Sequence, residues 1–177
     1  MSAAATGMRL FFAAWPKAEV ATQLAAWARE TADGTGGRVT HSETIHLTLA
    51  FLGEVAVTRG ADAVAAARRV DAPPHAFAIE VARYWAHNRI VWVGPREMPV
   101  SLGALAEGLR SELGASGFAL ERRPFAAHVT LIRRARAPAA PLEPPAVQWP
   151  VREFVLVRSM LSREGASYEV LERFALR

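Results

Sequence analysis

The segment Ile45–Leu52, with the sequence IHLTLAFL, decides the fold because its residues alternate in character. Side chains of a strand alternate between its two faces, so this segment is expected to present two different surfaces. One surface would hold His46, Thr48 and Ala50, and the other would hold Leu47, Leu49 and Phe51. The apolar surface can anchor the strand in a core, while the histidine and threonine face a ligand.

A second segment, Ala127–Ile132 (AHVTLI), repeats this pattern and places His128 and Thr130 on one face. The elements around both segments also recur. Strands are expected at 9–14, 77–81, 89–93, 154–161 and 168–176, and helices after Pro16, at 58–70 and along Leu102, Leu105, Leu109 and Leu113. The stretch 135–150, with five prolines, is expected to be a surface loop. Two similar lobes packed face to face would place the two His-x-Thr strands across a cleft.

Composition excludes several classes of chemistry. The chain has 177 residues and no cysteine, which rules out disulfides, cysteine-based zinc sites, iron–sulfur clusters and thiol nucleophiles. The apolar run 10–15 is too short for a signal peptide, and no segment is long enough to span a membrane. A cytoplasmic protein with a single domain over residues 1–177 is therefore expected. The net charge of +4 slightly favours an anionic ligand.

The paired histidines suit acid–base chemistry. An imidazole has an ordinary pKa near 6.5, so at neutral pH one ring can accept a proton while its partner donates one. Opening a cyclic phosphodiester needs these two transfers, because water loses a proton and the departing ribose oxygen gains one. Threonine hydroxyls at 48 and 130 can donate to the non-bridging oxygens. Arg133 can add a charged donor, although Arg134 beside it is an alternative.

Other readings of these residues carry less weight. A single His-x-Thr is a weak pattern, but two copies at matching positions of a repeat favour catalysis. Zinc generally needs three or four protein ligands, and neither motif contains a carboxylate. The chain also lacks His-Glu-x-x-His, the Gly-x-x-x-x-Gly-Lys loop of ATP-binding proteins and Gly-x-Ser-x-Gly. No role is assigned to His41, His75 or His87.

Taken together, these segments resemble a known family. The resemblance covers nearly the whole chain and includes RLFFA at 9–13, HLTLAFLG at 46–53, RIVWVG at 89–94, RPF at 123–125, HVTL at 128–131 and YEVL at 168–171. In these residues the chain is similar to the two-histidine (2H) phosphoesterases, and among them to the RNA 2′,3′-cyclic phosphodiesterases, also called 2′-5′ RNA ligases. The resemblance implies a bilobal α+β fold with a pseudo-two-fold axis, in which antiparallel sheets line a central cleft and helices lie outside.

The resemblance also implies an activity. RNA ends with a 2′,3′-cyclic phosphate would be hydrolysed to 2′-phosphomonoesters without a metal or nucleotide cofactor, and RNA ends would be joined reversibly through a 2′-5′ linkage without ATP. By motif position His46 would be the proton donor and His128 the proton acceptor, roles that the pseudo-symmetry makes easy to exchange. Thr48, Thr130 and Arg133 would bind the phosphate. A monomer is expected because one chain supplies both histidines.

The resemblance does not assign every contact with the substrate, and it leaves two other functions to consider. Many family members carry a basic residue where this chain has Ala50, so one phosphate contact is missing here. Trp15, Trp85 and Tyr168 are candidates for stacking on the terminal base, but a place in the core or at its rim is the stronger expectation for each. Two other functions compete: an RNA-end-binding protein without catalysis, and a phosphodiesterase for another cyclic phosphate, such as an ADP-ribose cyclic phosphate.

Overall fold

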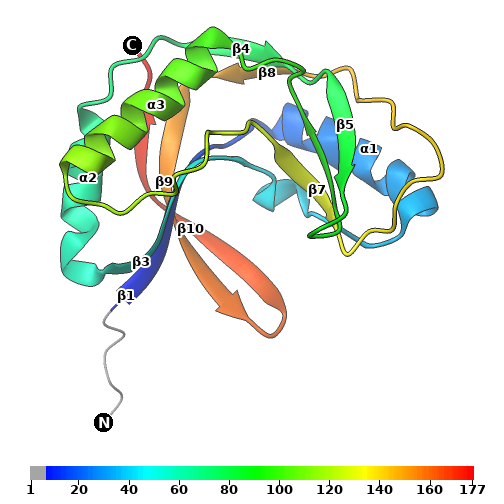
Figure 1. The fold of residues 1–177 in the computed structure, drawn as a ribbon, viewed down its shortest axis with the longest axis horizontal. Helices are drawn as coiled ribbons and strands as arrows, with labels where there is room; N and C mark the ends of the chain where they lie inside the picture. Colours follow the sequence, from blue (N-terminus) through cyan, green and yellow to red (C-terminus); the bar gives the residue numbers. More distant parts are fainter. Residues whose placement is uncertain (1–6) are drawn as a thin grey trace.

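The fold is built from antiparallel sheets with helices outside them, in the computed structural model that describes residues 7–177 (Figure 1). The strands are β1 (Gly7–Ala14), β2 (Arg38–Val39), β3 (Leu47–Ala56), β4 (His75–Ala78), β5 (Val81–Trp85), β6 (Ile90–Gly94), β7 (Val129–Arg133), β8 (Gln148–Val151), β9 (Glu153–Ser162) and β10 (Gly165–Ala175). The α-helices are α1 (Ala18–Thr35), α2 (Gly60–Arg68) and α3 (Val100–Ala115), and short 3-10 turns cover Ser42–Thr44 and Val57–Arg59. None of these helices is both long and apolar enough to cross a membrane.

Two four-stranded sheets carry the two histidine segments. One has the strand order β10-β9-β1-β3 and the other β2-β7-β6-β5, while β4 and β8 form a two-stranded sheet. Every strand pairing is antiparallel. The mixed α and β composition and the antiparallel sheets confirm the fold class expected from the sequence.

The helices are exchanged between the two sheets. Helix α1, which precedes the first histidine segment, packs against β2 and β7 of the second sheet. Helix α3, which precedes the second histidine segment, packs against β3 of the first sheet and is covered by α2 (Figure 1). The leucine stripe of α3 is fully buried, and one apolar cluster joins residues of both sheets, from Leu10 and Leu47 to Val91 and Leu131.

Two β-bulges change the faces of β3. Ala13 pairs with Thr48 and Phe12 pairs with Ala50, so Leu49 is an extra residue, and a second irregularity follows further along the strand. A bulge shifts the alternation by one residue. The expectation that Ala50 shares the face of His46 and that Phe51 points to the core is therefore wrong beyond Thr48, because Ala50 is buried and Phe51 is 42% exposed.

Two other expectations need correction. The single strand expected at 77–81 is divided between β4 and β5, because the backbone changes partners: the Ile79 amide donates to the carbonyl of Val147, and the Glu80 amide donates to that of Gly94. The proline-rich stretch is a loop only in its first part. Its end forms β8, where Trp149 is fully buried and stacks on Phe77 with ring centroids 5.5 Å apart.

Candidate active site

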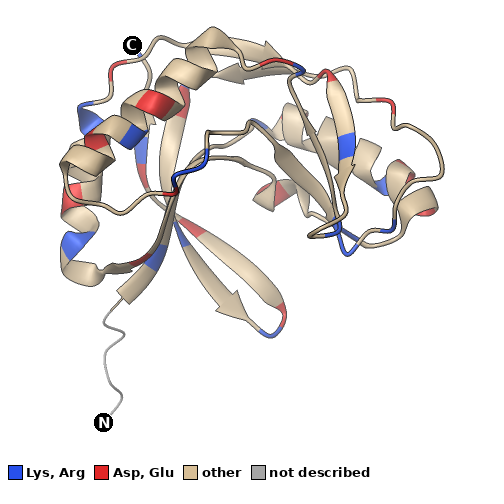
Figure 2. Ribbon diagram, in the orientation of Figure 1, with Lys and Arg blue, Asp and Glu red and all other residues tan. Residues whose placement is uncertain are grey.

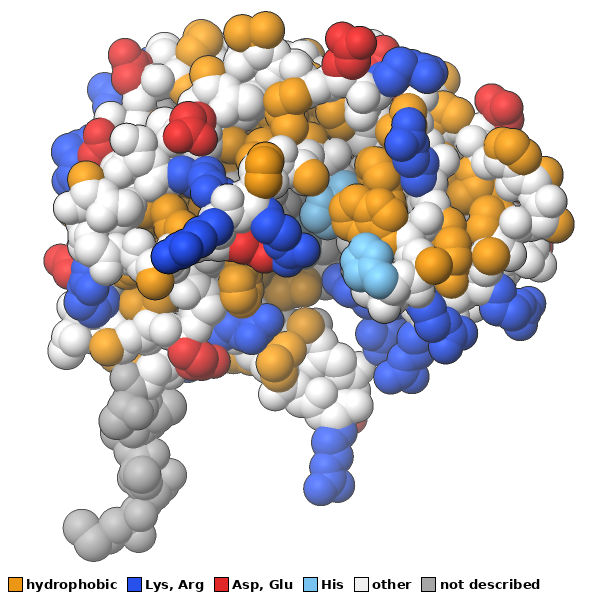
Figure 3. Space-filling model, in the orientation of Figure 1, with side chains coloured by type: hydrophobic (Ala, Val, Ile, Leu, Met, Phe, Trp, Pro, Cys, Tyr) orange, Lys and Arg blue, Asp and Glu red, His pale blue; other side chains and the backbone are white. Residues whose placement is uncertain are grey.

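The five site residues expected from the sequence meet in one cavity of about 320 Å³. His46 and Thr48 reach it from β3, and His128, Thr130 and Arg133 reach it from β7. Each histidine lies one residue before its strand begins, at Leu47 and at Val129, rather than inside it as expected. Figure 3 shows histidine side chains at the edge of the hollow between the two halves of the molecule.

The two imidazoles are held in the same way. Nδ1 of His46 lies 2.7 Å from the carbonyl oxygen of Thr44, and Nδ1 of His128 lies 2.9 Å from that of Ala126. A carbonyl oxygen only accepts hydrogen bonds, so each Nδ1 must carry the proton. Nε2 of each ring is thereby left as the atom that can exchange a proton with a ligand. The repeat seen in the sequence thus extends to the local hydrogen bonding.

Aromatic side chains enclose His46. The ring of Trp15 stacks on it, with centroids 5.0 Å apart and planes 11° apart. Phe11 contacts it at 5.0 Å, and Tyr168 meets it edge-on at 5.2 Å. These contacts fix the orientation of the imidazole and withdraw it from water.

His128 has a second set of aromatic neighbours. The Trp85 ring lies 4.8 Å from its imidazole, and Trp92 meets it edge-on at 6.2 Å. Trp15, Trp85 and Tyr168, considered from the sequence as base-stacking residues, therefore each contact an imidazole of the site. Of the three, Tyr168 also lines the cavity.

Close backbone approach positions β7. A Cβ atom on Gly94 would lie 2.6 Å from the carbonyl oxygen of Ala127, beside His128. Gly37 has a φ of +91°, and a Cβ there would lie 2.6 Å from the carbonyl oxygen of Arg133. Only glycine fits at such distances and adopts such a φ readily. Both ends of β7 therefore depend on a residue without a side chain.

The environment of His46 disfavours its charged form. The pKa of His46 is lowered to about 4. Burial is the largest cause, and the charges of Arg133 and His128 add to it, while the hydrogen bond to the Thr44 carbonyl acts in the opposite direction. At neutral pH the free protein therefore holds His46 as the neutral imidazole. In that state Nε2 carries a lone pair and can accept a proton.

This lowered pKa predicts how stability depends on pH. Between pH 6.5 and pH 4 the unfolded chain binds a proton at this histidine and the folded protein does not, so the free energy of unfolding falls as the pH falls. The shift corresponds to about 3 kcal/mol. Denaturant unfolding at pH 7 and pH 4.5 should show a smaller loss for His46→Gln than for the wild type. Equal losses in both proteins would contradict the prediction.

The structure adds residues that sequence reasoning missed. Arg38, Thr40, His41, Thr44 and Asn88 also line the cavity. Strand β2 brings one of them, Arg38, to the site, but its two residues are too few to show an alternating pattern. The Thr40 hydroxyl donates to the carbonyl of Thr130 at 3.1 Å, which ties this segment to β7. His41, to which no role was assigned, thus lies at the site.

A metal ion would need several protein ligands close together. Within residues 7–177, no three His, Asp or Glu side chains come together in a way that could hold a metal ion. The polar groups that line the cavity are imidazoles, hydroxyls and guanidiniums, together with the Asn88 amide and the Glu164 carboxylate. Two imidazoles, each one residue before a strand of a different sheet and each followed by a threonine at the second position, define the class of two-histidine phosphoesterases.

Comparison with known proteins narrows this class. Residues 15–92 match the family model described as LigT-like phosphoesterase. The chain is 37% identical to the RNA 2′,3′-cyclic phosphodiesterase of Escherichia coli over 95% of its own length and 96% of that protein, and 36% identical to that of Thermus thermophilus over 96% and 91%. The chain therefore belongs to the LigT-like phosphoesterase family.

Solved structures of similar proteins have the same fold as this chain. The crystal structure of E. coli LigT complexed with 3′-AMP superposes with a TM-score of 0.87, at 36% identity over 96% of this chain and 98% of that one. A Thermus thermophilus protein, TT0787, gives a TM-score of 0.82 at 31% identity over 96% of this chain and 98% of that one. The agreement in fold therefore covers nearly the whole chain.

Proposed function

We propose that this protein is an RNA 2′,3′-cyclic phosphodiesterase that converts cyclic phosphate ends to 2′-phosphomonoesters. The observation that carries the proposal is the pair of imidazoles that line one cavity, each with Nδ1 bound to a carbonyl and Nε2 left for a ligand. Several relatives that match over most of their length bear the name RNA 2′,3′-cyclic phosphodiesterase, which supports the choice of substrate.

In the proposed reaction the cavity holds the cyclic phosphate between β3 and β7. His128 accepts a proton from water as the water oxygen bonds to phosphorus, and His46 donates a proton to the 3′-oxygen as the bond between phosphorus and that oxygen breaks. The entering and leaving oxygens lie roughly in line, which suits bases on opposite walls. Thr48, Thr130 and Arg133 stabilise the charge on the non-bridging oxygens.

The donor role requires a proton that His46 does not hold in the free protein, since its pKa is about 4. We infer that the substrate brings this change. The phosphate anion adds a negative charge beside the imidazole and offsets the positive charge of Arg133, and both effects raise the pKa of His46. Binding of a cyclic phosphate should therefore be accompanied by proton uptake.

The same chemistry accommodates ligation. If the 5′-hydroxyl of a second RNA replaces water, the same bond to the 3′-oxygen breaks and a 2′-5′ phosphodiester forms, with no need for ATP. The reverse reaction passes through the same two histidines with their roles exchanged. We also propose that residues 1–177 act as a single domain and as a monomer, since one chain supplies all of these groups.

Phosphorus NMR tests the reaction directly. An RNA with a 2′,3′-cyclic phosphate end, incubated with the protein and EDTA, should yield the resonance of a 2′-phosphomonoester. A His46→Ala, His128→Ala double variant should yield none. A 3′-phosphate product, or loss of the reaction in EDTA, would contradict the proposal. Turnover of small cyclic phosphates but not of RNA would favour another cyclic phosphate as substrate, and product binding without turnover would favour an RNA-end-binding protein.

A further inference from the structure

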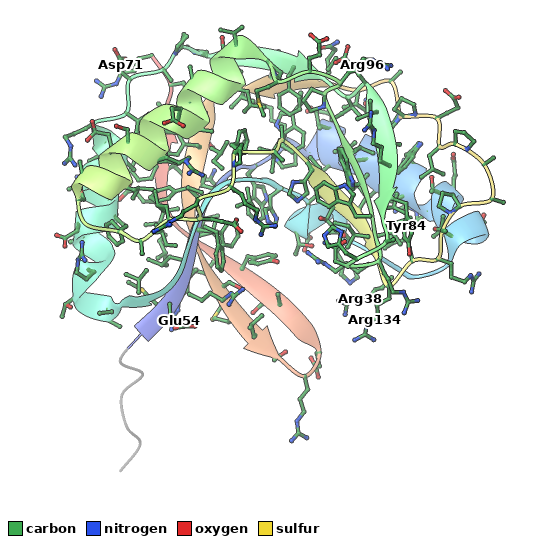
Figure 4. The ribbon with its side chains drawn as sticks, in the orientation of Figure 1. Arg38, Glu54, Asp71, Tyr84, Arg96 and Arg134 are labelled. Carbon is green, nitrogen blue, oxygen red and sulfur yellow. The ribbon has the colours of Figure 1, made fainter. Side chains whose placement is uncertain are left out.

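A group of arginines lies at one mouth of the cavity, where the mechanism does not use it. Arg38, Arg134 and Arg136 are exposed, and they are called the arginine shelf here. Arg38 lines the cavity itself and pairs across the sheet with Arg133, the residue before Arg134, and Figure 4 labels Arg38 and Arg134 at the same end of this sheet. Figures 2 and 3 show basic residues gathered at this end.

The shelf places positive charges close together without a local counter-charge. Arg38 is the direct cross-strand partner of Arg133, and like charges in that position are destabilising. Within residues 7–177, no carboxylate lies within ion-pair distance of the three shelf guanidiniums. Glu164 lines the same cavity but forms no ion pair with them. An anion bound at this mouth would relieve the repulsion.

The backbone beneath the shelf is held in an unusual conformation. Arg134 has a φ of 57° and Arg89 a φ of 56°, values that are uncommon for residues other than glycine. Arg89 braces this turn, because its Nη2 donates to the carbonyl of Arg134 and its Nε to that of Ala135. Such strained positions concentrate at functional sites. Here the strain lies in the turn that carries Arg134 beyond Arg133.

Neighbouring segments hold two shelf side chains in place. A Cβ on Gly165 would lie 3.5 Å from Nη1 of Arg38, so this guanidinium packs against the tip of the β9–β10 hairpin. A Cβ on Gly36 would lie 3.3 Å from Nη2 of Arg136, so that guanidinium lies over the end of α1. The shelf thus leads outward from the cavity, from Arg38 to the surface beside β7.

We propose that the arginine shelf binds the phosphodiesters upstream of the cyclic end, so that the preferred substrate is an RNA chain rather than a mononucleotide. This inference rests on the proposed function and adds a second subsite to it. A terminal ribose in the cavity must continue through its 5′-oxygen to the next phosphate, and arginine is well suited to bind phosphate. Such contacts act on the RNA backbone and carry no sequence information.

The test compares a long and a short substrate. For the Arg134→Gln, Arg136→Gln double variant, kcat/KM on a tetra-adenylate with a 2′,3′-cyclic end should fall roughly tenfold, because charge-assisted contacts to the RNA backbone are lost. On adenosine 2′,3′-cyclic monophosphate, which has no upstream phosphate, kcat/KM should change less than twofold. The dependence of the tetra-adenylate reaction on salt should become shallower by about one unit in a log–log plot.

A control variant separates the shelf from general charge. Arg29→Gln with Arg152→Gln removes two positive charges at exposed positions away from the cavity, and it should leave both substrates unaffected. Equal losses of kcat/KM on both substrates, or no loss on the tetra-adenylate, would overturn the proposal that the arginine shelf binds upstream phosphodiesters. Fluorescence anisotropy with a 2′-phosphorylated tetra-adenylate tests the subsite without turnover. If the wild type cleaves neither substrate, the proposed reaction is wrong. If the wild type and the double variant bind the 2′-phosphorylated tetra-adenylate with equal affinity, the proposed subsite is wrong, whatever the outcome for the reaction.

Discussion

His128→Ala and His46→Ala should each lower kcat/KM for a cyclic-phosphate RNA end by roughly 10²–10⁴-fold, the usual contribution of a general acid or base. Each imidazole has its Nδ1 fixed on a carbonyl, so alanine removes the Nε2 that is left to exchange a proton with the ligand. Steady-state assays with EDTA present measure the effect. Wild-type rates in both single variants would refute acid–base catalysis by this pair.

His75→Ala provides a matched control. Nδ1 of His75 also lies close to a backbone carbonyl, that of Pro73, at 2.9 Å, but this histidine does not line the cavity. Thermal unfolding of all three variants shows whether the fold is intact. His75→Ala should keep wild-type kcat/KM, so a loss of activity in this variant would point to a structural effect.

A substrate with sulfur in place of the 3′-oxygen separates the roles of the two histidines. A thiolate leaves without a proton, so this substrate should restore much of the activity of the variant that lacks the acid. If His46 is the donor, His46→Ala should be rescued and His128→Ala should not. The opposite pattern would show that His128 is the donor and His46 the acceptor. The test is needed because His46 is neutral in the free protein and carries no proton to donate from Nε2.

Arg133→Ala should lower kcat/KM by roughly 10²–10³-fold, as loss of a donor to the developing charge usually does. Arg133 lines the cavity and, by its charge, also lowers the pKa of His46. Its removal should therefore raise that pKa, but only in part, because burial is the larger cause. Titration of the imidazole resonances by NMR would detect the rise.

Two further variants serve as controls for Arg133→Ala. Arg133→Lys retains the charge without the planar fork, so it should recover part of the rate and leave the His46 pKa low. Arg152→Ala, at an exposed position outside the cavity, should change neither quantity. If Arg133→Ala retains full activity, Arg133 does not bind the phosphate, and its neighbour Arg134 becomes the candidate.

The place of the two histidines and two threonines in one cavity was predictable because they lie on short regular segments. His46 and Thr48, like His128 and Thr130, keep the two-residue spacing that places both side chains on one surface, and the cavity contains all four. The spacing fails after Thr48, where the bulge at Leu49 turns Ala50 inward. Bulges depend on pairing with another strand, so alternation within one segment does not reveal them.

Other parts of the site depend on contacts between distant residues. Arg38 reaches the cavity because β2 pairs with β7, and no local pattern in a two-residue strand indicates that pairing. Trp149 illustrates the same limit in the core, since prolines around it are typical of a loop while its burial comes from pairing of β8 with β4. The low pKa of His46 likewise follows from burial by Phe11 and Trp15, in and just after β1, and by Tyr168 of β10, all far from His46 in the sequence.

The exchange of helices between the sheets has a consequence for folding. Because α1 covers the sheet that contains β7, and α3 covers β3, neither half of the sequence contains a complete hydrophobic core. A fragment that ends before α3 would leave the apolar face of β3 exposed to water. Folding must therefore bring together partners that lie far apart in the chain, which makes it slow but cooperative. A folding intermediate in which only one of the two sheets has formed should therefore not accumulate.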